Sequence, residues 1–310
     1  MSESVPPGVG TGMDYEETID ERPMRMLEVW RSLKRDPAAL GSLMLLVLVI
    51  VVAVLSPFIS PHDPLQTFND IGLGPLGQPL PPGTPGFLLG TDALGRDVLS
   101  RLISGTQVSL VIGIVANGLA TLVGVLVGVI AGYFGGIIEA ILMRITDVVI
   151  SFPILLLCTA LIAVTTRSTT NVIIVIALIY WTTLARIIRG MVISLKQREF
   201  VIATRTLGVG HLKIMWKHII PHLLPAIIVY ATLGIAASIL IESALSFLGI
   251  GVPIPQASWG QMISDGSTYF QIAPWMLFFP GACLIVTVMA FNLLGDWLSE
   301  LLNSSAPMAR

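Results

Sequence analysis

The chain has 310 residues, of which 54% are hydrophobic and only 12% are charged, and its formal net charge is −2. An ordinary soluble domain has about 25% charged residues, so the composition excludes a typical soluble enzyme and indicates a protein that crosses a membrane several times. The net charge near zero gives no reason to expect a nucleic acid as a partner.

The N-terminal tail, residues 1–38, is predicted to lie outside the bilayer. Residues 1–21 are rich in glycine, proline and acidic residues, a composition typical of disorder. Residues 24–35 predict a helix on the membrane surface with an apolar side made of Met26, Leu27, Val29, Trp30 and Leu33. A simple anchor beside the membrane is the alternative. The first apolar run starts only near Leu40, later than in a secretory signal peptide, so we interpret it as a retained membrane anchor.

Six apolar stretches are candidates for transmembrane helices, since a span needs about 20 apolar residues. They comprise residues 40–59, 107–131, 147–166, 171–184, 221–241 and 272–294. We therefore expect an all-α polytopic membrane protein with both termini on the same side. Cys158 and Cys283 lie in these runs and are expected to be packing residues, which indicate neither a disulfide nor a compartment.

The distribution of basic residues predicts the orientation of these helices. Of the 17 lysines and arginines, only Arg96, Arg101 and Arg167 fall on one side of the six predicted spans. Loops rich in Lys and Arg stay in the cytoplasm, so the tails and residues 198–221 should be cytoplasmic. The loops near 60–105, 167–170 and 242–271 should face outward. We divide the chain into a tail (1–38), a first helix with its outer loop (39–105), a core (106–296) and a C-terminal tail (297–310).

Several charged residues outside the tails invite specific interpretations. Asp92–Arg96 and Asp97–Arg101 are i,i+4 pairs, and with Leu94, Val98 and Leu102 they predict an amphipathic helix at the outer interface that leads into the second span. Two acids beside two arginines make a poor calcium site, so we do not expect a metal there.

Two acidic residues lie close to predicted spans. Asp147 should pair with Arg144 at the cytoplasmic start of the third span. Glu242 lies about one bilayer thickness after Pro221. It either faces a substrate path near an outer gate, because charge close to lipid is costly without a use, or lies at a solvated helix end.

The segment 198–221 predicts two short helices with a corner between them. Residues 199–207 form the first helix, Gly208 and Gly210 break it, residues 211–218 form the second, and Pro221 starts the fifth span. The apolar residues of this segment should pack against the spans or against a partner protein; they are Phe200, Val201, Leu207, Ile214, Met215 and Trp216.

Three histidines in and beside this segment raise the question of zinc. His211 and His218 share a predicted helix face, and His222 follows. Pro221 interrupts the helix between the last two, and no cysteine or acid completes a ligand set. We therefore favour a structural or docking use over a metal site.

The same segment resembles the EAA loop of ABC-importer permeases, whose pattern is E-A-A-x3-G-x9-I-x-L-P. Ala203, Gly208 and Pro221 fall at the required spacings, whereas Ile202, Thr204, His218 and Ile220 depart from it. The peptide-importer branch shows E-[YF]-V-x-A-A-R-x-x-G and H-x-L-P, which agree better. The residues that match that version are Glu199, Phe200, Val201, Ala203, Arg205, Gly208, His218 and Pro221.

Two further stretches resemble this branch, GTDALGRDVLSRLISG at residues 90–105 and ESALSFLGIGVPIPQASWGQMI at residues 242–263. From about Gly90 onward the chain is similar to the C-type permeases of dipeptide/oligopeptide importers. The resemblance implies the type I ABC importer permease fold with six transmembrane helices, in the bacterial plasma (inner) membrane. It also implies a set of partners: a homologous B-type permease as heterodimer, two ATP-binding subunits, an extracytoplasmic solute-binding protein, a peptide substrate and membrane lipid.

In this family the segment docks into a cleft on a cytoplasmic ATPase, and the resemblance carries that role to specific residues. They are Glu199, Phe200, Ala203, Thr204, Arg205, Gly208 and His211. No G-x-x-x-x-G-K-[ST] phosphate loop occurs in this chain. We therefore expect ATP and magnesium to be bound by the partner ATPases, and this chain to hold no cofactor and to catalyse no reaction.

Other functions remain as alternatives. Nickel and glutathione importers share these motifs, so the sequence does not choose the substrate. A stand-alone secondary transporter would show internal repeats and ionisable groups at mid-membrane, and an intramembrane enzyme would need clustered His, Asp, Glu or Cys at depth. Neither pattern is found in the predicted spans.

Overall fold

The computed structural model describes residues 26–304, and that part of the chain is helical with no named strand. The disorder predicted for residues 1–21 lies outside the described residues. Five helices are long and apolar enough to cross a membrane: α2 (Pro37–Ile59), α3 (Val98–Phe134), α6 (Thr169–Leu195), α9 (Ile220–Phe247, continuous with the chain from His211) and α11 (Trp275–Ser304). These helices confirm five of the six predicted spans.

The remaining span is bent and does not follow the straight path that the apolar run 147–166 predicts. Helix α4 (Gly136–Ser151) and helix α5 (Ile154–Ala163) meet at 90°, and they give a sixth span if the bent pair is counted as one. The break lies at Phe152, which is extended with φ −89° and ψ 141°. Pro153 follows it, and the residue before a proline is driven out of the helical region. The prediction of six spans is thus confirmed when this bent pair counts as one.

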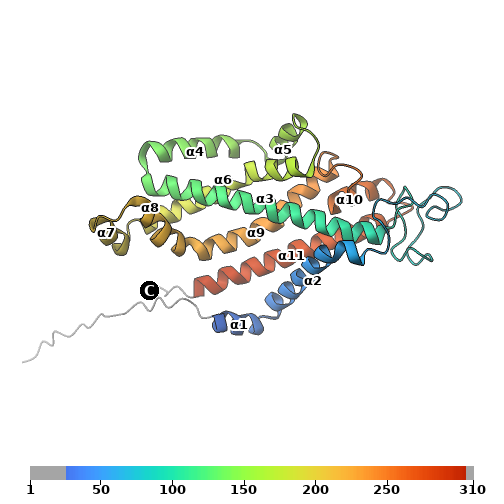
Figure 1. Cartoon of the computed structure of the whole chain (residues 1–310), viewed down its shortest axis with the longest axis horizontal. Helices are drawn as coiled ribbons and strands as arrows, with labels where there is room; N and C mark the ends of the chain where they lie inside the picture. Colours follow the sequence, from blue (N-terminus) through green and yellow to red (C-terminus); the bar gives the residue numbers. More distant parts are fainter. Residues whose placement is uncertain (1–25, 305–310) are drawn as a thin grey trace, which may run out of the picture.

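The long helices lie side by side in an elongated arrangement (Figure 1). Helix α4 lies along α3 and α6, α9 follows, and α11 and α2 form the other side of the molecule. The loop 60–97 and α10 (Trp259–Thr268) lie at one end, whereas α7 (Glu199–Thr206) and α8 (His211–Ile214) lie at the other. Helix α1 (Met26–Arg35) lies beside the start of α2. The helix predicted for residues 24–35 exists from Met26, and its place on the membrane surface stays a prediction.

Helices α3 and α6 run parallel in close contact through glycine. A Cβ atom at Gly124 would lie 2.8 Å from the Trp181 carbonyl oxygen, and one at Gly128 would lie 2.7 Å from that of Ala185. A Cβ atom at Gly132 would lie 2.7 Å from the Cβ of Val192. Small residues four apart allow two backbones to approach in this way inside a membrane, where dispersion contacts replace hydrophobic burial as the driving force. This glycine row therefore holds the centre of the molecule together.

Candidate functional site

The segment predicted to dock on an ATPase begins with α7 and a glycine corner. Gly208 has φ +76°, which is the left-handed conformation that favours glycine. Its N–H donates to the Arg205 carbonyl at 3.0 Å, and the Val209 N–H donates to the Thr204 carbonyl at 3.4 Å. These two bonds form a Schellman motif, which satisfies the last carbonyls of a helix. The predicted corner is confirmed, and its geometry is held by backbone hydrogen bonds.

The second predicted helix is not separate from the fifth span, which corrects the expected two-helix knob. Residues His211–Ile214 continue through a π-helical turn, Met215–Ile219, directly into α9. Pro221 has no N–H, and its ring crowds the carbonyl four residues earlier. The π turn accommodates this by widening the helix, so that the Ile220 N–H donates to the Met215 carbonyl. Pro221 therefore does not interrupt the helix.

The corner has a packed inner side and an uncovered outer side. Val201, Ile214 and Met215 are buried in a cluster with residues of α3, α6 and α9. Large apolar side chains on the other side are exposed in this chain: Ile202, Leu207, Leu212 and Trp216, with Leu207 at 83%. Of the predicted docking residues, Phe200 and Thr204 are half-buried, and the rest (Glu199, Ala203, Arg205, Gly208 and His211) are exposed. The predicted residues thus lie together on one protruding surface, which we call the corner surface.

The rings of His211 and His222 lie against different partners. The Tyr133 hydroxyl lies 2.9 Å from Nδ1 of His211. The ring of His222 stacks on that of Phe200 at 4.8 Å, and its Nδ1 lies 2.5 Å from the carbonyl of His218. Among residues 26–304 no three His, Cys, Asp or Glu side chains gather as a metal-binding group.

Polar contacts connect α3 and α4 to α6. The Lys196 ammonium donates to the Gly132 carbonyl at 2.8 Å, which is favourable at the negative C-terminal end of α3. Arg189 forms an ion pair with Glu139. Arg186 pairs with Asp147 at 2.6 Å, so the predicted Arg144–Asp147 pair is wrong. Asp147 pairs with Arg186 because α4 and α6 lie side by side.

Glu242 is fully buried, with 0% of its surface exposed, which contradicts the solvated helix end. The hydroxyl of Ser246 donates to its carboxylate at 2.7 Å, that of Ser109 at 3.1 Å and that of Ser243 at 3.4 Å. The same hydroxyls of Ser109 and Ser246 accept the backbone N–H groups of Trp259 and Val252. Glu242 therefore links α3, α9 and the start of α10 through serines, and it is not among the residues that line the cavity between α3, α6 and α9.

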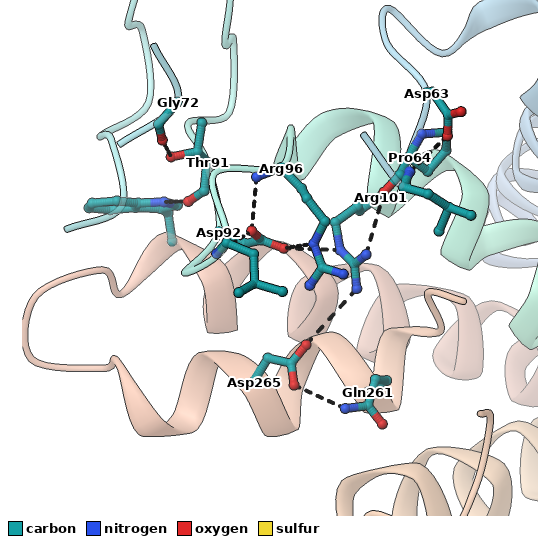
Figure 2. Close-up of polar contacts among 12 residues, drawn as sticks. Asp63, Pro64, Gly72, Thr91, Asp92, Arg96, Arg101, Gln261 and Asp265 are labelled. Carbon is teal, nitrogen blue, oxygen red and sulfur yellow. Dashed lines mark hydrogen bonds and ion pairs between the residues drawn. The ribbon is translucent and has the colours of Figure 1, made fainter. Parts of the chain in front are cut away.

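The loop 60–97 and the start of α3 carry a buried ion cluster (Figure 2). Asp92 accepts from the Arg96 side chain at 2.7 Å and lies 3.3 Å from Nε of Arg101. Arg101 also donates to the Pro64 carbonyl at 3.4 Å and lies 4.0 Å from Asp265 on α10. Asp92, Arg96 and Arg101 are all buried, and together they join the outer loop, α3 and α10.

This cluster corrects the predicted amphipathic helix at 92–102. Residues 90–97 form a tight turn with Gly95 at φ +70°, and the helix begins only at Val98. The Asp92–Arg96 pair is confirmed but spans that turn. Asp97 caps α3 by accepting from the Ser100 N–H at 3.0 Å, so the predicted Asp97–Arg101 pair is wrong. Helical spacing suggested this pairing, but an acid just before a helix is better used as its cap.

Sequence reasoning missed the serines around Glu242 and the role of Asp265. Ser243 and Ser246 stand one and four residues after Glu242 in α9, a spacing that places Ser246 beside the carboxylate. Ser109 and Asp265 are far away in sequence, and no local pattern connects them to their partners.

Two family models match the chain. The one described as "Binding-protein-dependent transport system inner membrane component" matches residues 124–306. The other, described as "N-terminal TM domain of oligopeptide transport permease C", matches residues 25–82.

Curated relatives align over almost the whole chain. The di/tripeptide transport system permease protein DppC of Pseudomonas aeruginosa (strain UCBPP-PA14) is 36% identical over 281 residues, which is 91% of this chain and 92% of the relative. The dipeptide transport system permease protein DppC of Bacillus subtilis (strain 168) is 39% identical, over 89% of this chain and 84% of the relative. A glutathione transport system permease protein, GsiD of Escherichia coli O157:H7, is 37% identical over 89% of each.

A solved structure resembles the fold. It is an inward facing conformation of the MetNI methionine ABC transporter, with a TM-score of 0.50 and 19% identity over 66% of this chain and 96% of the solved chain. At this identity the likeness supports the importer permease fold alone.

Proposed function

This chain belongs to the family of binding-protein-dependent transport system inner membrane components, and from that membership we propose that it imports peptides as one half of an ATP-driven pathway. It is a multi-pass membrane permease subunit of an ABC importer. We further propose that it works without chemistry of its own, in the plasma membrane of a bacterium and with both termini in the cytoplasm. The partners would be a second permease, two ATP-binding subunits and an extracytoplasmic solute-binding protein.

The observation that carries the coupling role is the corner surface. Four large apolar side chains are exposed at its tip: Ile202, Leu207, Leu212 and Trp216. Because exposed apolar patches mark interaction sites, this surface favours a protein partner. The inner side of the same segment is packed into the spans. A segment with an exposed apolar side and a side packed against the spans fits a contact that transmits movement from an ATPase.

The continuous helix from His211 to Phe247 gives that movement a direct route. A displacement of the corner would move α9 as one body, because no break separates the two. On the other side of the corner, Val201 of α7 packs against residues of α3 and α6 in the same buried cluster. A movement of the corner would therefore reach α9 directly and α3 and α6 through the packing of α7.

The proposed substrates are short peptides. Two of the relatives are named for dipeptides and di/tripeptides, and a third for glutathione, which is itself a tripeptide. Uptake of labelled dialanine, trialanine, glutathione and nickel by cells with and without this gene tests the substrate class. Nickel uptake that depends on the gene, without peptide uptake, would contradict the proposal.

The coupling role is tested at Gly208. Valine there strains the backbone, since positive φ is a genuine outlier for a β-branched residue, at a cost of roughly 1–3 kcal/mol. Because nothing lies within 4 Å of an added Cβ, the effect comes from the backbone alone. We expect Gly208→Val to insert and to pair with the second permease, but to lose ATPase subunits on purification or to lose peptide-stimulated ATP hydrolysis.

Gly208→Asn is the matched control, because asparagine tolerates the left-handed conformation. It should retain most of the coupling, although it places a larger side chain at the same position. Normal transport by Gly208→Val, or equal loss in both variants, would show that the corner geometry has no part in coupling.

A further inference from the structure

A cavity of about 160 Å³ opens between α3, α6 and α9. It lies near the middle of each helix, since Thr121 stands close to the centre of Val98–Phe134 and Tyr180 and Tyr230 lie well inside Thr169–Leu195 and Ile220–Phe247. Its polar lining consists of Asn117, Thr121, Tyr180, Thr183 and Tyr230, and no charged residue contributes to the lining. The cavity is therefore uncharged and mainly apolar, with a few polar side chains in its lining, and it lies at mid-membrane depth.

The floor of the cavity is fixed by Asn117. Its side-chain amide donates to the Ala231 carbonyl at 2.7 Å across α3 and α9. A Cβ atom at Gly234 would lie 2.1 Å from its Oδ1, so α9 can approach only because residue 234 is glycine. This contact sets the distance between the two helices that bound the cavity.

The four hydroxyl groups above this floor have no hydrogen-bond partner among residues 26–304; they belong to Thr121, Tyr180, Thr183 and Tyr230. Threonines elsewhere in the spans behave differently. Thr182 donates to the Ile179 carbonyl at 2.8 Å, and Thr232 donates to the Ile228 carbonyl at 2.9 Å. Polar groups without a partner are costly inside a membrane, and a polar ligand in the cavity would give these hydroxyls the partners that they lack within residues 26–304.

We propose that this cavity binds the main chain of the transported peptide, an inference that rests on the proposed importer function. A hydroxyl can donate to a carbonyl or accept from an N–H, and a peptide offers both at every residue. The tyrosine rings give apolar cover for side chains of different size. Because the lining has no charge, it recognises neutral amides and not the charged termini, which suits a path that passes peptides of varied sequence.

Removing single hydroxyls tests the site in the complete transporter, reconstituted with one binding protein. We expect Tyr180→Phe, Tyr230→Phe and Thr183→Val each to lower kcat/KM for trialanine uptake by about 3- to 10-fold, the range for one lost hydrogen bond. Thr232→Val is the matched control on α9, because its hydroxyl already bonds to its own helix. It should change uptake less than 2-fold.

An ester analogue of trialanine separates binding from mere structure. It lacks one main-chain N–H, so a hydroxyl that accepts this group should show coupling in a double-mutant cycle. Replacing trialanine by the ester should lower kcat/KM more in the wild type than in at least one of the three variants. Any effect of the ester on the binding protein is the same in all of them, so it cancels. Strict additivity in all three would overturn the proposal.

The rival occupant is a helix of the second permease. In a background without Cys158 and Cys283, Thr183→Cys should be protected from a thiol reagent by peptide during turnover. Crosslinking of this cysteine to the second permease, with no protection by peptide, would assign the cavity to the subunit interface and overturn the proposal. Failure of the wild type to import trialanine would overturn both proposals, whereas normal uptake with unaffected variants would overturn only this one.

Discussion

Two buried acidic residues, Asp92 and Glu242, each have several partners. Asp92 contacts two arginines, and Glu242 accepts from three serine hydroxyls. Carboxylates are costly to bury unless hydrogen bonds or opposite charges compensate them. The compensating groups come from different elements, so each carboxylate also fixes how those elements meet.

Loss of charge at Asp92 should destabilise the outer end strongly. Asp92→Asn leaves Arg96 and Arg101 buried with weaker compensation, and breaking a buried ion pair costs roughly 3–5 kcal/mol. We expect a lower thermal midpoint of the purified protein in detergent and faster proteolysis of the 60–97 loop.

Asp265→Asn provides the comparison at the same cluster. Its side chain is 37% exposed and lies 4.0 Å from Arg101, so the change should cost about 1 kcal/mol or less. An Asp265→Asn midpoint that falls as far as that of Asp92→Asn would contradict the assignment of Asp92 as the central acceptor.

At the scale of elements, the α3–α6 contact depends on the absence of side chains. The row Gly124, Gly128 and Gly132 lets α6 approach until its backbone would touch an added Cβ. Longer side chains would push the helices apart, and the α7 cluster that packs on their inner ends would lose its support.

Gly128→Leu should therefore separate α3 from α6. Overpacking of this kind costs at least about 1–3 kcal/mol, and here the added Cβ would lie 2.7 Å from a backbone oxygen. Gly118→Leu on the same helix is the control, since nothing lies within 4 Å of its added Cβ. Size-exclusion profiles and thermal midpoints of the chain in detergent should show a loss for Gly128→Leu alone. Equal behaviour of the two variants would refute the close α3–α6 contact.

The whole molecule has two distinct ends. The loop 60–97 and α10 lie at one end, and α7 and α8 lie at the other. The basic residues predict that the second end is cytoplasmic, and this orientation stays a prediction.

Cysteine labelling in intact cells tests this orientation. Single cysteines at Asn69 and Gln256, both exposed, should react with an impermeant thiol reagent, whereas one at Gly210 should react only after the membrane is permeabilised. Labelling of Gly210→Cys from outside would reverse the topology.

Composition was sufficient for the number and order of the membrane spans, with the bent α4–α5 pair counted as one, because apolar length is a local property of the sequence. Local chemistry also predicted the corner at Gly208 and the Asp92–Arg96 pair. It failed where tertiary contacts decide which residues pair. Asp147 pairs with Arg186 of a neighbouring helix, and Arg101 pairs with Asp92 and not with Asp97. The mid-membrane hydroxyls escaped notice because their significance depends on which threonines lack a partner, and no sequence pattern contains that fact.

The parallel packing of α3 and α6 also constrains how the chain can be made. Gly132 and Val192, which meet in the finished protein, are 60 positions apart, and a whole return crossing by α4 and α5 lies between them. At a synthesis rate of about 5–20 residues per second, α3 waits roughly 3–12 s in the bilayer with its glycine face unmatched. During that interval the growing chain depends on lipid, or on the insertion machinery, to cover a groove that only its own later part can fill.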